Sequence, residues 1–463
     1  MKKTYIDTAM ERIAPDLILK GGNVVDVFSG RVIKADVIIK DGIICGVGSY
    51  SGENEQDVSG KYIMPGFIDS HVHIESSMTQ PSEYAKAVMP HGITTVIADP
   101  HEITNVCGED GLEFMLKSAK NIPLDVNLML PSCVPATPFE HTGANLDAKT
   151  TQKLAPKFFG IGEMMNYPGI VSGDDETLGK LCLDIVDGHA PLLSGHELDA
   201  YASAGIKTDH ECSVIEEMTE KISKGMYILI REGTLSLDVA KLIKGVTPYT
   251  LRRCAFCTDD RFVGEIIRDG SIDHCIRKAV SLGLSNIDAI IMATLNACEI
   301  YGMKNKGAIA PSYVADIVVA DDLNLSSISQ VYKNGKLVCE NGKALFECET
   351  VDNSKVTNTV HLPKISDDFF KTDVKDKFDA IELIPKSIIT KKVTVSYSDS
   401  LSKVCVIERH HNLGTKGIGF VTNYGITNGA IATSIGHDSH NVIVIGDNDS
   451  DMALAVNTLG TSG

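Results

Sequence analysis

The sequence lacks the features of a membrane-spanning, exported or nucleic-acid-binding protein. No uninterrupted apolar run approaches the roughly 20 residues that a helix needs to cross a bilayer. The N-terminal MKKTYIDTAMER has two lysines but no apolar segment behind them, so we expect no signal peptide. A basic excess is also missing, because the net charge is −18 and the pI is about 5.2. This charge argues against binding to nucleic acid or to an anionic membrane through a broad basic face.

A disulfide framework is absent as well. The 12 cysteines are scattered without the regular spacing of a disulfide-rich protein. In a chain without an export signal, reduced thiols are the expected state. We therefore predict a cytoplasmic protein. Low-complexity segments and helical repeat arrays are not found either.

What remains is an ordinary globular composition with several domains. Of the 463 residues, 43% are hydrophobic and 22% are charged, which is enough to bury a sizeable core. A chain of this length predicts two or three domains.

Two β-rich segments enclose a long middle segment. Residues 16–64 and 313–345 both contain short runs of alternating apolar and polar residues, separated by Gly and Asp-Gly or Asn-Gly turns. We expect them to pair into one small β-sandwich, with residues 1–64 as its first part and 311–350 as its second.

The middle segment, residues 65–310, alternates apolar strand-like runs with helical stretches, which is typical of a parallel sheet with crossover helices. Eight such units in about 245 residues match the size of a (β/α)8 barrel. The strand candidates are FIDSHVH (67–73), TTVIADP (94–100), LDVNLML (124–130), FFGIGEM (158–164), LCLDIVDGH (181–189), GIKTDHE (205–211), MYILIRE (226–232) and CAFCTDD (254–260). The stretches GLEFMLKSAK, ECSVIEEMTEKISK and IDAIIMATLNACEIYG predict helices.

A third region follows a polar linker after about residue 350. Strand-like runs such as KKVTVSYS, KVCVIERH and HNVIVIGD predict an α+β domain over residues 351–463. The whole chain is therefore expected to be an α/β protein: a barrel, a β-sandwich made from both flanks, and a C-terminal α+β domain.

The end of the first barrel strand carries the first sign of a metal site. In PGFIDSHVHIESS (65–77), His71 and His73 are two residues apart, so in a strand both imidazoles point to the same side. Two neutral imidazoles make an incomplete metal site. A chance pair is the alternative, so the remaining ligands must come from elsewhere.

Other barrel strands also end in side chains that bind metals. The fourth strand carries Glu163, the fifth ends in His189, the sixth in His210, and the eighth in Asp259 and Asp260. The carboxyl ends of barrel strands converge on one mouth, so we expect these groups to meet. Four imidazoles with two carboxylates suit two divalent first-row ions, with Glu163 bridging them.

Each ligand also has an ordinary structural explanation. A histidine at a strand end is often only hydrogen-bonded or solvated. Glu163 could be a buried carboxylate paired with Arg or Lys, and Asp259 could cap the following helix. The coincidence of five strand ends in one eight-unit pattern favours the metal site.

These residues lie in motifs that resemble the bacterial adenine deaminases of the amidohydrolase superfamily. The resemblance runs from about residue 15 to the end of the chain, and HIESS with DPHE is more specific than the His-x-His pair. The motifs are PGFIDSHVHIESS, DPHE (99–102), DGHAP (187–191), TDHE (208–211), CTDDR (257–261), HDSHN (437–441) and DMALAVN (451–457).

The resemblance implies a reaction and a cofactor. The expected reaction is adenine plus water giving hypoxanthine plus ammonia, a step of purine salvage. The expected cofactor is a pair of divalent metal ions, Mn²⁺ or Fe²⁺, with Zn²⁺ as a further candidate. Many relatives in the superfamily use a carboxylated Lys on strand four, and Glu163 at this position fits the deaminase branch. The ligands implied by motif match are His71, His73, Glu163, His189, His210 and Asp259.

Further strand-end residues suit proton transfer and recognition of the base. Asp259 is the candidate to accept a proton from the nucleophilic water, and Asp99 is the candidate to protonate the purine ring. Glu211, Arg231 and Glu232 are candidates to read the edge of the base. The alternatives are a turn before Pro100 for Asp99, and a simple ion pair between Arg231 and Glu232.

Three smaller motifs have plainer interpretations. In HDSHN, His437, Asp438 and His440 form either a turn before a strand or a contribution to the pocket. The CxxC of Cys254 and Cys257 has no second pair for zinc and predicts core packing. The HIE of residues 73–75 imitates a base-deaminase zinc motif, but its companion Pro-Cys-x-x-Cys is missing.

Two features depart from the family pattern. The segment after CTDDR reads FVGEIIRDG, where many members have a His-Pro-like pair. The chain ends at NTLGTSG, whereas family members run on by roughly another hundred residues, so we expect an incomplete C-terminal domain.

Two other functions stay open. One is a cyclic amide hydrolase on the same fold, and the other is an inactive shortened protein with a binding role. The expected partners are the small-molecule substrate and further copies of the chain in a homo-oligomer.

Overall fold

The computed structural model describes residues 2–373, 376–385, 389–396 and 401–462. The chain divides into two compact units. The first comprises Met1–Asp99, Leu116–Leu130 and Gln152–Thr350, and the second comprises Pro100–Met115, Pro131–Thr151 and Val351–Gly463. The second unit includes Pro100–Met115 and Pro131–Thr151, which lie within the barrel range of 65–310 predicted from the sequence. The predicted domain boundaries stay predictions.

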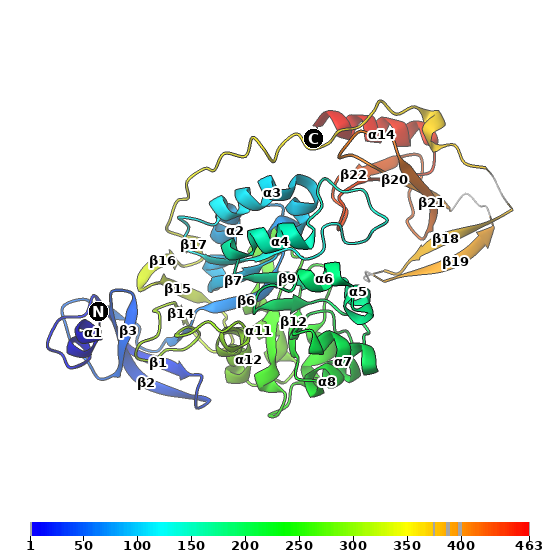
Figure 1. The fold of residues 1–463 in the computed structure, drawn as a ribbon. Helices are drawn as coiled ribbons and strands as arrows, with labels where there is room; N and C mark the ends of the chain where they lie inside the picture. Colours follow the sequence, from blue (N-terminus) through cyan, green and yellow to red (C-terminus); the bar gives the residue numbers. More distant parts are fainter. Residues whose placement is uncertain (1, 374–375, 386–388, 397–400, 463) are drawn as a thin grey trace. The chain divides into compact units, whose positions relative to one another are not determined.

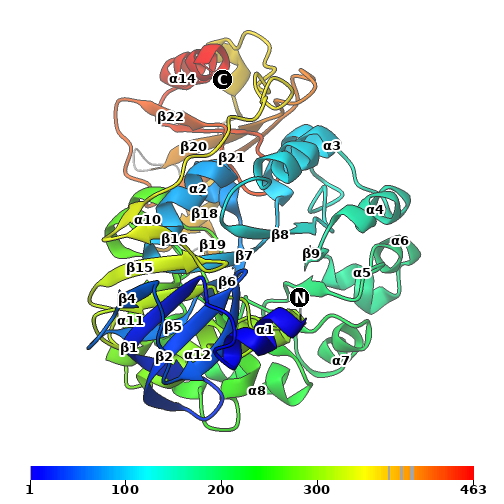
Figure 2. The same ribbon diagram turned by 90° about the vertical axis from the view of Figure 1, so that its left-hand side faces the viewer.

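The first unit contains eight parallel strands in barrel order, of which β6, β7, β8, β9 and β12 are labelled in Figures 1 and 2. Pairing runs through β10-β9-β8-β7-β6 and through β11-β12-β13, and a parallel bridge between Val72 and Asp259 connects the last strand to the first. All eight predicted strands occur, and the predicted α/β barrel is confirmed. The strands are β6 (Phe67–Val72), β7 (Ile93–Ala98), β8 (Asp125–Leu130), β9 (Gly160–Met164), β10 (Val186–Gly188), β11 (Thr208–Asp209), β12 (Tyr227–Arg231) and β13 (Cys254–Cys257).

Several of the barrel strands are buried along their whole length. Every residue of β6, β7, β9 and β13 is buried, as expected for strands covered on both faces. The short β10 and β11 are followed directly by His189 and His210, so the functional side chains lie where the strands end.

Amphipathic helices lie between the strands. In α8, the spacing of Glu217, Met218 and Lys221 places all three on the buried side. The helix predicted over 287–302 is interrupted at Thr294, whose backbone is not helical (φ −137°, ψ −86°), so it forms α12 and α13. Helices of this unit are α1 (Lys2–Ala9), α2 (Pro81–Val88), α5 (Tyr167–Ser172), α6 (Asp175–Gly179), α7 (Gly195–Ser203), α8 (Ile215–Ser223), α9 (Val239–Leu242), α10 (Val263–Asp269), α11 (Ile272–Ser281), α12 (Asn286–Ala293) and α13 (Leu295–Ile300).

The two β-rich flanks join in one nine-stranded sheet, as Figure 2 shows for β1, β2, β5 and β15. The flanks meet where β5 pairs antiparallel with β14, and one apolar cluster takes residues from both flanks. The Asp41-Gly42 and Asn334-Gly335 turns have two positive φ angles each, as tight hairpins require. The strands are β1 (Leu17–Asp26), β2 (Arg31–Lys40), β3 (Ile43–Gly48), β4 (Glu55–Asp57), β5 (Tyr62–Pro65), β14 (Ile317–Ala320), β15 (Ile328–Lys333), β16 (Lys336–Glu340) and β17 (Lys343–Ala344).

The second unit contains a six-stranded sheet in the order β19-β18-β21-β20-β23-β22. Helix α14 (Asp449–Ser462) packs on it through Met452 and Val456. Most of α3 (His101–Ser118) also belongs to this unit. The predicted strand KKVTVSYS forms β19 up to Ser396, and its last two residues lie outside the described residues. The strands are β18 (Lys377–Leu383), β19 (Thr390–Ser396), β20 (Ser402–Ile407), β21 (Lys416–Thr422), β22 (Ala430–Thr433) and β23 (Val442–Gly446).

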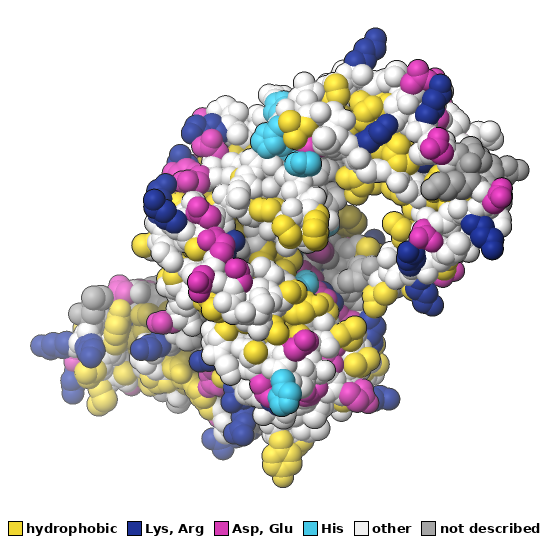
Figure 3. Space-filling model, turned by 45° about the vertical axis from the view of Figure 1, so that its right-hand side comes forward, with side chains coloured by type: hydrophobic (Ala, Val, Ile, Leu, Met, Phe, Trp, Pro, Cys, Tyr) yellow, Lys and Arg dark blue, Asp and Glu magenta, His cyan; other side chains and the backbone are white. Residues whose placement is uncertain are grey.

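Surface charge and helix hydropathy were also compared with the composition. On the face in Figure 3, basic and acidic side chains are interspersed and do not form one broad basic field. Within the described ranges, no helix combines the length and the apolar character needed to cross a bilayer.

Candidate metal centre

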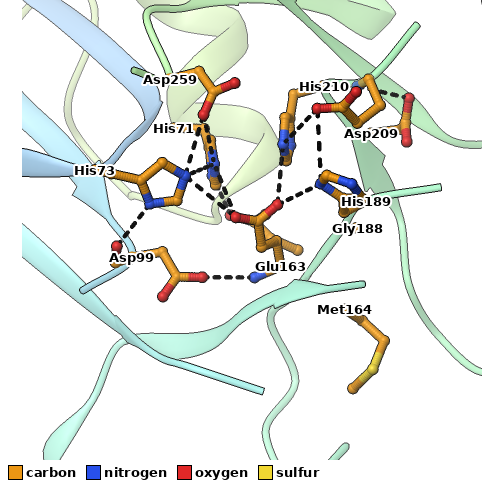
Figure 4. A network of polar contacts seen from close by, with 12 residues as sticks. His71, His73, Asp99, Glu163, Met164, Gly188, His189, Asp209, His210 and Asp259 are labelled. Atoms are coloured by element: carbon orange, nitrogen blue, oxygen red, sulfur yellow. Dashed lines mark hydrogen bonds and ion pairs between the residues drawn. The ribbon is translucent and has the colours of Figure 1, made fainter. Parts of the chain in front are cut away.

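Six side chains from five barrel strands meet at one place (Figure 4). They come from the end of β6, from β9, and from the residues that follow β10, β11 and β13. Their ligand atoms form overlapping groups in which all atoms lie within 4.8 Å of one another, as metal ligands do. The six residues are those the sequence singled out: His71, His73, Glu163, His189, His210 and Asp259.

The two oxygens of Glu163 face different histidines. Oε1 lies 3.2 Å from His73 Nε2 and 3.9 Å from His71 Nε2. Oε2 lies 2.6 Å from His189 Nδ1 and 3.2 Å from His210 Nε2. One carboxylate thus stands between two pairs of imidazoles, which is the geometry of a bridging ligand.

Asp259 completes the first of these two groups. Its Oδ1 lies 3.1 Å from His73 Nε2 and 3.8 Å from His71 Nε2. The first residue of α10 is Val263 and its N-cap is Phe262, so Asp259 does not cap that helix.

The tautomer of His73 is fixed by the backbone. Its Nδ1 lies 2.9 Å from the carbonyl oxygen of Asp99, and because a carbonyl can only accept, Nδ1 must carry the proton. The Nε2 lone pair then points into the group, 3.2 Å from His71 Nε2. An outer hydrogen bond of this kind orients and strengthens a metal-binding imidazole.

The carboxylates of the group are ionised despite their burial. Burial raises the pKa of Glu163, but His189 and His210 outweigh it and hold the pKa well below its usual value. Burial likewise opposes ionisation of Asp259, whose pKa is nevertheless held well below normal by His73, His210 and Arg231. Both groups are therefore available as anionic ligands.

One side of the group is open to solvent. His71, His73 and His210 are at most 3% exposed, whereas the side chain of His189 is 26% exposed. Burial lowers the pKa of His189, but the charge of Glu163 raises it to about 9. The negative charge of Glu163 stabilises the protonated imidazole of His189, and it would stabilise a bound cation at the same place.

Arg231 holds three carboxylates in place. Its Nη1 donates to Glu211 and, at 2.9 Å, to Asp259, while its Nε donates to Asp238 at 3.1 Å. Glu211 Oε1 in turn lies 3.7 Å from both His189 Nδ1 and His210 Nε2. Arg231 and Glu211 are thus brought to the group as the sequence suggested, with the guanidinium engaged by protein carboxylates.

Glu232 is not brought to this group. Successive strand residues point to opposite sides, and the carboxylate of Glu232 pairs with Lys278 on α11 and accepts the Val239 N–H at 3.3 Å. The suggested ion pair between Arg231 and Glu232 is wrong, because the two side chains have these separate partners.

Asp99 lies directly beside the ligands. Its Oδ2 accepts the N–H of Glu163 at 2.9 Å. A Cβ on Gly162 would overlap this carboxylate, so the approach of Asp99 requires glycine there. Asp260, which follows Asp259 in the sequence, accepts a hydrogen bond from Ser76 Oγ at 2.5 Å.

Several supporting residues were not foreseen from the sequence. Asp69 accepts hydrogen bonds from Thr258 across β6 and β13, and Asp187 faces His71 Nδ1 at 3.8 Å. The Asp-Gly-His spacing of Asp187 and His189 repeats the i, i+2 pattern of the His pair and would have indicated Asp187.

Behind His210, a fully buried lysine fixes the strand end. Lys221 Nζ donates to Asp209 at 2.9 Å, to Glu217 at 2.8 Å and to the Ala190 carbonyl at 2.7 Å. Asp209 also accepts the Ala190 N–H, so one carboxylate connects the ends of β10 and β11.

The remaining motifs lie elsewhere. Cys254 and Cys257 are buried in β13, and Cys257 packs in an apolar cluster, in agreement with the core interpretation. His437 and His440 belong to the second unit, where both contact Glu102.

The donor set fits divalent first-row metal ions. Four imidazole nitrogens and three carboxylate oxygens point inward, and nitrogen–oxygen donor sets of this kind suit Zn²⁺, Mn²⁺ and Fe²⁺. The two oxygens of Glu163 face His71 and His73 on one side and His189 and His210 on the other, and His210 also forms a group with His71 and Asp259.

Comparison with known families agrees with this geometry. The model of the amidohydrolase family matches residues 62–338, and the model of the adenine deaminase C-terminal domain matches residues 383–463. The first match covers more than half of the chain.

Curated relatives match nearly the whole chain. An adenine deaminase from Clostridium acetobutylicum is 48% identical over 98% of this chain and 83% of its own length. An adenine deaminase from Halalkalibacterium halodurans is 44% identical over 96% of this chain and 80% of its own.

Solved structures share the fold at low identity. Enamidase, an amidohydrolase superfamily member, superposes with a TM-score of 0.54 and 18% identity, over 72% of this chain and 97% of its own. The β-aspartyl dipeptidase of Fervidobacterium islandicum gives a TM-score of 0.53 and 20% identity, over 73% and 99%. The chain therefore belongs to the amidohydrolase family and, within it, to the adenine deaminases.

Proposed function

We propose that the chain catalyses the hydrolytic deamination of adenine to hypoxanthine and ammonia. The observation that carries this proposal is the 48% identity to a named adenine deaminase over 98% of the chain, combined with the complete set of six inward-facing ligands. Glu163, where other branches have a carboxylated Lys, supports the deaminase over the cyclic amide hydrolase. The full ligand set speaks against an inactive protein with only a binding role.

The cofactor we propose is a pair of divalent ions, Mn²⁺ or Fe²⁺, with Zn²⁺ as a further candidate. His71, His73 and Asp259 would hold one ion, His189 and His210 the other, and Glu163 would bridge them. When bound, such ions lower the pKa of a water molecule toward neutrality and so supply a hydroxide nucleophile.

Asp259 is the proposed proton carrier. Its Oδ1 faces His71 and His73, while its Oδ2 is held by Arg231, and these contacts on two sides support a role beside the reacting water. It accepts a proton from the attacking water and delivers it to the amine as the C6–N6 bond breaks and ammonia leaves.

Asp99 and Glu211 are the proposed contacts to the purine ring. Asp99, held by the Glu163 N–H, supplies a proton to the ring nitrogen and takes one back from the new C6 hydroxyl as the carbonyl forms. Glu211 accepts a hydrogen bond from the base edge at the solvent-exposed side near His189. Because the guanidinium of Arg231 is bound by three carboxylates, we propose that it positions Glu211 and Asp259 and does not itself read the base.

The test is a substrate panel with the purified chain. With Mn²⁺ or Fe²⁺ supplied, ammonia release is measured from adenine, and ring opening is measured with dihydroorotate and hydantoin. Turnover of adenine alone is expected. Turnover of a cyclic amide without adenine, or no turnover of any of the three by a folded, metal-loaded protein, would overturn the assignment.

A further inference from the structure

The second unit contains a cluster of metal-binding side chains besides the six named above. His101 and Glu102 form the first turn of α3, and His437, Asp438 and His440 lie in the loop before β23. Glu102 and His437 are 335 residues apart in the sequence, yet His437 Nδ1 contacts Glu102 Oε1.

Glu102 is at the centre of this cluster. Its Oε1 contacts His437 Nδ1 and lies 3.2 Å from His101 Nε2, and its Oε2 contacts His440 Nε2. His101 Nε2 also lies 3.3 Å from Asp438 Oδ1. Three imidazole nitrogens and two carboxylates thus converge from two segments of the chain.

Around His101 Nε2, the spacing of the neighbouring oxygens matches a coordination shell. Ligands about 2.1 Å from a first-row ion lie roughly 3.0–3.4 Å from one another in octahedral or tetrahedral geometry. The separations of 3.2 Å and 3.3 Å around His101 Nε2 fall in this range.

The charge and burial of the cluster also suit a cation. Glu102 is 2% exposed, and although burial raises its pKa, the neighbouring His101, His437 and His440 lower it well below the usual value. The side chains of His437 and Asp438 are 43% and 26% exposed, which gives an ion a route in from solvent.

The loop that carries the second half of the cluster is held from behind. His410 Nε2 contacts the carbonyl oxygen of Ser439 at 2.7 Å, and Asn441 Nδ2 donates to the His141 carbonyl at 2.8 Å. The N–H of His440 donates to the Gly436 carbonyl at 2.7 Å, which closes the turn. Such outer contacts fix ligand positions before a metal arrives.

We propose that His101, Glu102, His437, Asp438 and His440 form a further site for one divalent first-row transition ion. The ion joins the first turn of α3 to the loop before β23. Since ligands from distant segments come together only in the folded chain, its binding free energy stabilises the second unit.

The test counts metal ions on the full chain. Metal-free protein is saturated with Zn²⁺, unbound ion is removed, and bound zinc is measured by inductively coupled plasma mass spectrometry. The variant His437→Ala/His440→Ala is expected to bind one ion fewer per chain than the unchanged protein. His196→Ala, a substitution of a fully exposed histidine, is the matched control and is expected to bind the same number.

Two further measurements test the proposal if the double variant folds poorly. Zn²⁺ is expected to raise the melting temperature of the unchanged protein by more than that of Glu102→Gln. Crystals of the unchanged protein soaked in Zn²⁺ are expected to show an anomalous peak between Glu102 and His440. The proposal would be overturned by equal zinc counts in all folded variants, or by the lack of an anomalous peak between Glu102 and His440 at saturating Zn²⁺. Either result would count against this site alone, independently of the metal content of the barrel site.

Discussion

Removal of the Arg231 side chain tests how the barrel site is held together. Its Nε, Nη1 and Nη2 reach Asp238, Asp259 and Glu211, and the side chain is only 5% exposed. In Arg231→Met these carboxylates lose their shared cation while staying buried. Removal of one partner from a buried ion pair costs about 3–5 kcal/mol, a large part of the 5–15 kcal/mol that is typical of a whole domain.

Activity should fall together with stability, because Asp259 loses its fixed position. A displacement of about 1 Å at a reacting group costs roughly 100-fold in rate. Arg231→Lys keeps one positive charge but cannot donate to three carboxylates at once, so we expect an intermediate loss.

The assays are urea unfolding and ammonia release from adenine at saturating Mn²⁺. Arg268→Met is the matched control, since the Arg268 side chain is 67% exposed and pairs only at the surface with Asp269. This control should change the free energy of unfolding by less than about 1 kcal/mol. If Arg231→Met kept both wild-type stability and wild-type kcat, the positioning role would be refuted.

Three other perturbations have defined outcomes. Lys221→Met should lower the free energy of unfolding by about 3–5 kcal/mol. Burial raises the pKa of Asp209, but Lys221 outweighs burial and holds this pKa below its usual value, so Asp209 adds stability above its unfolded pKa of about 3.9 that is lost as the pH falls through the folded pKa. Without Lys221 the loss should occur at a higher pH, which circular dichroism during acid titration would detect. Gly162→Ala should displace Asp99 and lower kcat about 100-fold with a small change in melting temperature. Chelation should abolish ammonia release and lower the melting temperature, and added Mn²⁺ or Fe²⁺ should restore both; activity that survives complete metal removal would contradict the metal-dependent mechanism.

The barrel strands could be predicted because burial on both faces leaves a clear signal. The runs of β7 and β13 are mostly apolar and are followed within two residues by Asp99 and Asp259, whereas β6 itself carries Asp69, Ser70 and His71. The break between α12 and α13 at Thr294 could not be predicted, since the sequence keeps a helical pattern through a residue whose backbone is not helical.

The inward-facing side chains were easier to predict than the residues that support them. His71 and His73 stand out by spacing, whereas Lys221 is one lysine among several on an amphipathic helix and becomes notable only when buried against Asp209. The partners of Arg231 depend on how three strand ends meet in space, which no local pattern in the sequence specifies. For the same reason, Glu102 could not be linked to HDSHN before the two segments were seen together.

The most direct test of the barrel site is a crystal of the Mn²⁺-loaded protein measured at the manganese absorption edge. Two anomalous peaks about 3.5–4 Å apart are expected, one beside His71 and His73 and one beside His189 and His210, with Glu163 between them. A single peak, or none within reach of Glu163, in a protein that deaminates adenine would contradict the bridged two-metal account.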